Sequence, residues 1–115
     1  MDSILTTIKK LIGISEEDTN FDDEIVTDIN SAFMFLNQMG VGPEEGFAIE
    51  DKTSIWTDFL PDAKLLKMNS VKTYVHLKVK LMFDPPSSSA LLESINRQIS
   101  ECEWRLTQAA DFTTS

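Results

Sequence analysis

Residues 71–86, VKTYVHLKVKLMFDPP, are the stretch that decides the fold. This is the longest apolar-rich run of the chain, and Pro85 and Pro86 end it abruptly. Apolar residues alternate with lysines over 71–81, a period of two that is typical of a strand. On a helical wheel the same apolar residues share one broad arc with Tyr74 and Met82. The pattern alone therefore leaves strand and helix open.

The rest of the chain favours the helix. A single long strand would leave its backbone groups unpaired, and no other segment has a clear strand pattern. We therefore predict a helix over residues 71–83, with Lys72, His76 and Lys80 along its exposed side. Asp84 must end it, because a residue before proline is disfavoured in helical geometry.

A second long amphipathic helix is predicted to fold back on the first. Serines 87–89 supply caps for its start. Apolar residues then recur in steps of three and four as far as Leu106: Leu92, Ile95, Ile99, Cys102 and Leu106. Residues 107–115 lose this order, so we expect a tail there.

Two helices are predicted in the N-terminal half. The first spans about residues 4–12, with Asp2 or Ser3 as cap and Gly13 as its left-handed end. The second spans about residues 22–39, begins with three acids and ends at Gly40.

Residues 41–61 form a long connection without helical periodicity. Trp56 and Phe59 in it plug the end of the core or, alternatively, bind a partner. The expected fold is all-α: one domain, residues 1–108, with about four helices and a long loop between the second and third. A flexible C-terminal tail, residues 109–115, follows it.

Composition excludes several classes of protein. The formal net charge of −9 argues against wrapping a nucleic-acid backbone. No apolar run is long enough to span a bilayer, and the N-terminus lacks the order of a signal peptide. The single cysteine, Cys102, excludes an internal disulfide, which fits a reducing compartment.

Charge is segregated along the chain. Residues 13–62 hold thirteen acids and one lysine, whereas residues 63–83 hold five lysines, one histidine and no acid. One interpretation is a solvated surface with internal charge complementarity. The other is an acidic and a basic surface that meet between identical subunits. The residues expected at such an interface are Lys72, His76, Lys80, Glu44 and Glu45.

The residues needed for catalysis or metal binding are scarce. His76 is the only histidine and Cys102 the only cysteine, which excludes a two-histidine or multi-cysteine metal site. Cys102 lies on an apolar stripe, so we interpret it as a buried thiol. No glycine loop for phosphate is present. We expect no catalytic residue, no metal site, no cofactor and no enzyme activity.

Four segments carry a family resemblance: VGPEEGF at 41–47, SIWTDFL at 54–60, VKTYVHLKVKLMFDPPSSS at 71–89, and INRQISECEWRL at 95–106. Together they resemble the small head–tail connector, or adaptor, proteins of tailed phages and prophages of Gram-positive bacteria. The resemblance extends over about residues 4–106.

The resemblance implies an all-helical subunit of a ring, typically a dodecamer in the virion. Such a ring sits beneath the portal at the head–tail junction, binds the next neck or tail-completion protein, and lets DNA pass through its channel without specific binding. Family members can be monomeric before assembly, which would take place in the host cytoplasm. A C-terminal segment often docks on the portal; here it would include Asp111 and Phe112.

Two alternatives remain open from the sequence. One is another phage neck or tail-completion protein. The other is a small, non-catalytic regulatory helical protein, which would stay monomeric or dimeric and would not bind a portal.

Overall fold

The structure is a computed structural model that describes residues 3–114, and side chains within residues 3–108. Helices make up 64% of it, and residues 3–114 contain no strand, only one isolated bridge. The predicted all-α class is therefore confirmed. The helices are α1 (Ile4–Leu11), α2 (Asp22–Gln38), α3 (Trp56–Phe59), α4 (Leu65–Phe83) and α5 (Ser89–Thr114).

The N-terminal helices begin and end as predicted. The Ser3 Oγ accepts a hydrogen bond of 3.2 Å from the Thr6 N–H at the start of α1. Gly13 and Gly40 adopt φ angles of +85° and +81°, the left-handed conformation expected after each helix. Between them, three acids occupy the first turn of α2, where the helix dipole favours negative charge.

The long connection between α2 and α4 contains the single-turn helix α3 and closes one end of the core. Trp56 and Phe59 are buried, and both rings lie against Phe33 of α2. The Trp56 indole N–H donates to the Thr7 hydroxyl over 3.3 Å. These contacts confirm the interpretation that Trp56 and Phe59 plug the core.

Helix α4 lies at the centre of the bundle, which confirms the helix prediction for residues 71–83. It packs against α1, α2 and α5, so its buried residues face several directions: Val71, Tyr74, Val75, Leu77 and Val79. A helix covered on several sides has no clean apolar stripe, which explains the ambiguous pattern. Lys78, which falls among the apolar residues on a helical wheel, extends its ammonium over the Phe35 ring, 4.2 Å from the centroid.

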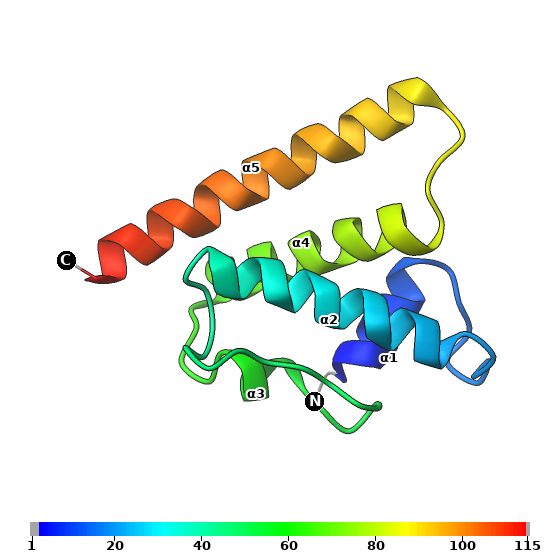
Figure 1. The fold of residues 1–115 in the computed structure, drawn as a ribbon, viewed down its shortest axis with the longest axis horizontal. Helices are drawn as coiled ribbons and strands as arrows, with labels where there is room; N and C mark the ends of the chain where they lie inside the picture. The colour runs from blue at the N-terminus through cyan, green and yellow to red at the C-terminus, as the bar shows by residue number, and fades with distance from the viewer. Residues whose placement is uncertain (1–2, 115) are drawn as a thin grey trace.

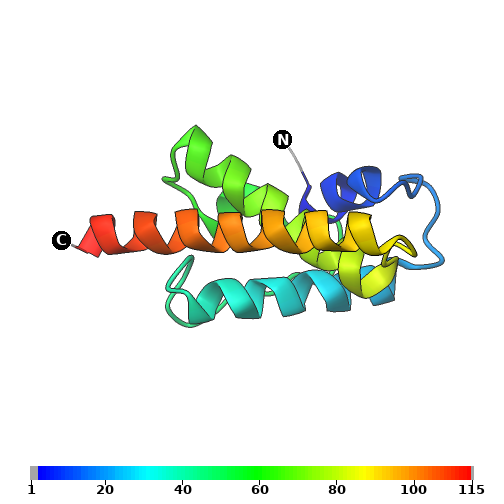
Figure 2. The ribbon, with the colours of Figure 1, turned by 90° about the horizontal axis from the view of Figure 1, so that it is seen from above.

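Helix α5 forms a separate layer on α4, as Figure 1 shows. Its N–H groups are capped by Ser88, whose Oγ accepts from Leu91 N–H over 3.3 Å. The helix runs to Thr114, not to Leu106 as predicted. No glycine or proline follows Leu106, and adding a residue to an existing helix costs far less than starting one. Figure 2 shows this end projecting beyond the other helices.

The long helices give the molecule two distinct ends along its longest axis, over which it extends 43 Å. Helix α4 runs opposite to α2 and α5 (Figure 1). One end therefore gathers the start of α4 with the last turns of α2 and α5. The other end gathers the loop before α2, the last turn of α4 and the start of α5.

Candidate assembly surfaces

An apolar groove of about 930 Å³ opens at the end where α4 begins. Its wall is made by Phe59 and Leu60, the start of α4 and Leu106 of α5. Leu65 and Leu66 are 75% and 81% exposed, the highest values among the large apolar residues of the described part. Two adjacent leucines in water beside an apolar groove are typical of a surface that another molecule covers.

The rim of this groove is cationic. Lys64, Lys67 and Arg105 line it with one acid, Asp62, which leaves a net charge of +2. The Arg105 guanidinium lies 3.9 Å from the Glu101 carboxylate, one turn earlier on α5, and both groups are exposed. Such an exposed pair is weak, so the guanidinium stays available to another acid.

The opposite end carries an acidic corner, which we define as residues 15–24. It holds six carboxylates: Glu16, Glu17, Asp18, Asp22, Asp23 and Glu24. Phe21 stands among them, 42% exposed, with its ring edge-on to Phe83 at 5.6 Å between centroids. The corner thus presents an aromatic side chain surrounded by negative charge.

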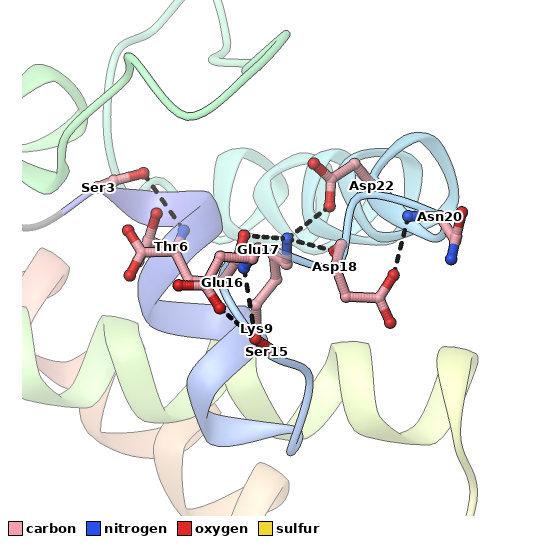
Figure 3. A network of polar contacts seen from close by, with 9 residues as sticks. All are labelled: Ser3, Thr6, Lys9, Ser15, Glu16, Glu17, Asp18, Asn20 and Asp22. Carbon is pink, nitrogen blue, oxygen red and sulfur yellow. Dashed lines mark hydrogen bonds and ion pairs between the residues drawn. The ribbon is translucent and has the colours of Figure 1, made fainter.

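A buried lysine holds the acidic corner in place (Figure 3). Lys9 is only 3% exposed, and its Nζ donates to the carbonyl oxygens of Glu16 and Asp18 at 3.1 and 2.7 Å. The same ammonium pairs with the Asp22 carboxylate at 2.8 Å. Three oxygens around one buried ammonium compensate for its lost hydration. Lys9 thereby ties α1 to the loop and to the start of α2.

The predicted basic side of α4 is less exposed than the sequence indicated. Lys72 and Lys80 are half-buried. The Lys72 ammonium lies 5.7 Å from the centre of the Trp56 ring, and Lys80 lies 3.8 Å from Asp84. Both therefore have contacts within their own chain.

His76 is also half-buried, which corrects its assignment to a fully exposed face. The end of α1 packs on α4, and His76 hydrogen-bonds to the backbone of Leu11. Burial lowers the pKa of His76 below 6.5, and the nearby Lys80 ammonium lowers it further, against the opposing effect of the Leu11 hydrogen bond. Single-sequence reasoning could not foresee which helix would cover this residue.

Glu44 and Glu45 are exposed and directly follow Pro43, which lines the apolar groove. The Asn37 amide donates to the carbonyl oxygens of Pro43 and Glu44 at 3.1 and 3.3 Å and fixes this loop on α2. These two acids therefore lie at the cationic end of the molecule. The side chains of Asp111 and Phe112 lie outside the described residues.

Cys102 is buried on the α4 side of α5, and burial raises the pKa of its thiol. A buried thiol of raised pKa is a poor nucleophile. Within residues 3–108, no group of three or more His, Cys, Asp or Glu side chains is arranged to hold a metal ion. None of the helices described combines the length and apolar character that a membrane span requires.

Sequence reasoning missed both ends as surfaces. The doublet Leu65-Leu66 between Lys64 and Lys67 was a usable signal, because two adjacent residues of a helix cannot both face one neighbouring helix. Phe21, which stands in a run of acidic residues, was a second usable signal. Lys9 gave no signal beyond an ordinary lysine near a helix end.

Comparison with protein families finds a match to the family described as Phage connector protein, over residues 4–113. Comparisons with curated proteins and with solved structures found no match. The family match spans every helix of the fold, from the first residue of α1 to the last turn of α5. The chain therefore belongs to the phage connector proteins, structural components that assemble with other proteins of the virion.

Proposed function

We propose that this connector protein is the subunit of a ring at the head–tail junction, bound beneath the portal and joining the DNA-filled head to the neck or tail. The observation that carries the proposal is the family match across residues 4–113. The groove with its cationic lining at one end and the acidic corner at the other support it, because contacts between unlike surfaces generate rings when the rotation closes.

The partners of such a subunit are its own copies, twelve in the virion, the portal protein, and the next neck or tail-completion protein. DNA passes through the channel without specific binding. The net charge of −9 supports this, since an acidic ring repels the phosphate backbone. Assembly takes place in the host cytoplasm and ends with the ring in the virion.

The proposed role is structural, without catalysis. The buried position of Cys102 supports this, because its thiol is not free to reach a substrate.

The experiment that tests the proposal is imaging of the protein mixed with the portal of its own phage. We expect rings of matching symmetry on the portal, seen by electron microscopy and weighed by native mass spectrometry. Binding only to a later neck ring would instead identify a tail-completion protein. If the protein stays a monomer or dimer and does not bind the portal, it would be identified as a regulatory protein and the proposal would be rejected.

A further inference from the structure

We propose that the apolar groove at the start of α4 receives the acidic corner of a second copy of this chain, so that copies join end to end. This inference rests on the proposed function, since a ring requires a repeated contact. It adds the two surfaces that meet and the chemistry that matches them.

The groove supplies the apolar half of the contact. Leu65 and Leu66 stand in solvent beside a cavity of about 930 Å³ whose inner wall includes the buried ring of Phe59. Covering apolar surface of this kind removes it from water, which favours a complex. The acidic corner offers a side chain of suitable chemistry, the exposed ring of Phe21.

Charge selects the second copy as the occupant. The groove residues carry three cations and one acid, and the corner carries six carboxylates against one compensating ammonium, that of Lys9. An acidic segment with an aromatic at its centre thus meets an apolar groove with a cationic rim. Complementary potentials of this kind favour the matched partner and oppose contact between two like ends.

The placement of the two surfaces makes the contact intermolecular. They lie at opposite ends of a bundle 43 Å long, so a molecule cannot fill its own groove (Figure 1). After docking, the pair keeps one free groove on one copy and one free corner on the other, which allows further copies to add. Because Lys9 already fixes the corner loop, little conformational entropy remains to be lost on docking.

A cysteine-trapping experiment tests this contact directly. Phe21→Cys is made in one copy of the full chain and Leu66→Cys in another, the second carrying an affinity tag, and the two are mixed under a mild oxidant. The matched control replaces Phe21→Cys by Met34→Cys, which is comparably exposed (55%) but lies outside both surfaces. We expect about tenfold more disulfide-linked heterodimer from the first mixture. Equal yields from the two mixtures would overturn the proposal.

Charge reversal tests the selectivity. Lys64→Glu with Lys67→Glu in the Leu66→Cys copy should remove the excess of heterodimer, and Asp23→Lys with Glu24→Lys in the Phe21→Cys copy should restore it. Added salt should lower the yield of the natural pair. The proposal would also be overturned if the yield of heterodimer stayed the same after the lysine reversals and after the additional acid reversals.

Binding to the portal separates this inference from the ring function. Leu66 is exposed, so Leu66→Asp should fold normally, as a thermal melt can check, but should not form rings. Rings of this variant on the portal would refute the groove contact and leave the ring function standing. A third outcome is that the Leu66→Asp variant no longer binds the portal and that the Phe21→Cys and Leu66→Cys pair gives no more heterodimer than the Met34→Cys control. This outcome would identify a portal segment as the occupant of the groove and would also overturn the proposal. If the cysteine pair gives the expected heterodimer but the natural protein does not bind the portal, the ring function alone would be refuted.

Discussion

Lys9 shows how one side chain can organise a surface that it does not itself form. Its buried ammonium satisfies two loop carbonyls and one carboxylate, so the acidic corner is ordered around it. Gly42 lines the groove at the other end of the molecule and packs closely on the core. Its φ of +91° and the Phe59 ring beside it permit no side chain at that position.

Replacing Lys9 should destabilise the protein. Lys9→Met removes the ion pair with Asp22 and leaves two carbonyl oxygens without their donor, so we expect the free energy of unfolding to fall by about 2 kcal/mol. Chemical denaturation measures this change. Lys10→Met is the matched control, because Lys10 is exposed on the same turn, and it should change stability by less than about 0.5 kcal/mol. Equal effects of the two changes would contradict the structural role of Lys9.

Gly42→Ala should lower the free energy of unfolding by about 3 kcal/mol, because the added Cβ overlaps the buried Phe59 ring and the backbone is left-handed. Gly46→Ala separates the two causes. Gly46 has a similar φ of +95° but open space around it, so only the backbone penalty of about 1 kcal/mol is expected. Thermal or urea unfolding of both variants gives the comparison. Indistinguishable losses would argue against a tight fit of Phe59 on the loop.

At the scale of elements, α4 determines the arrangement of the others. It contacts α1, α2 and α5, and its polar side chains find partners on those helices or at their edges. The hydroxyl of Tyr74 lies 3.3 Å from the Glu103 carboxylate on α5, and burial together with this carboxylate raises the pKa of Tyr74. His76 forms the corresponding polar contact with α1.

The α1–α4 contact should make stability depend on pH. The folded state lowers the pKa of His76 below 6.5, so the unfolded chain binds this proton more tightly. The contribution of His76 to the free energy of unfolding should therefore have its full value above pH 6.5. It should decrease as the pH drops from 6.5 through the folded-state pKa of His76.

Two measurements check this dependence. NMR titration of the single histidine gives its folded-state pKa without assignment ambiguity. Denaturation at about pH 7.5 and about pH 5.5 should show a smaller difference for His76→Gln than for the natural protein. A midpoint at or above 6.5 would contradict the burial of His76.

At the scale of the whole molecule, the two ends matter more than any single site. The predicted interface of Lys72, His76, Lys80, Glu44 and Glu45 stays a prediction. Two features weigh on it: the basic residues contact their own chain, and the two acids adjoin the cationic groove. Lys64 and Lys67 line the groove and are a second pair of basic residues, whose charge reversal can be compared with that of Lys72 and Lys80.

Charge reversal at Lys72 and Lys80 should weaken ring assembly more than fold stability if these residues meet an acidic neighbour. Ring formation on the portal at moderate salt, scored by electron microscopy, measures the first effect, and thermal unfolding the second. The matched variant reverses Lys64 and Lys67. Assembly that survives the first reversal and fails with the second would exclude the interface predicted from the sequence and favour the groove.

Deleting residues 111–115, which include Asp111 and Phe112, should leave the fold intact, because the described core ends at Leu106. We expect portal docking to weaken by about tenfold, equivalent to 1.4 kcal/mol of binding free energy. A sedimentation or surface-binding assay with the portal measures this. Equal binding by the truncated and full chains would reject a portal-docking role for the C-terminal segment.

The sequence by itself determined the helices and their class. Capping residues, left-handed glycines and prolines act within a few residues, so the limits of α1 and α2 and the end of α4 followed from local chemistry. The apolar stripe of α5 identified the buried residues Ile95, Ile99, Cys102 and Leu106, whereas its first member, Leu92, is 36% exposed. Four segments of the sequence carried the family resemblance. The extent of α5 beyond Leu106 did not follow, because loss of apolar periodicity signals loss of packing and not the end of a helix.

Only the tertiary structure decided the two candidate assembly surfaces. Lys9 became buried because the loop after α1 folds back over it, and His76 became half-buried because α1 lies across α4. Leu65 and Leu66 remain in solvent because, among residues 3–108, no side chain covers the start of α4 on that side. Each outcome depends on how segments of the chain pack against one another in space. Local propensity and periodicity carry no information about such contacts, and therefore the surfaces could be found only after the helices had been placed in space.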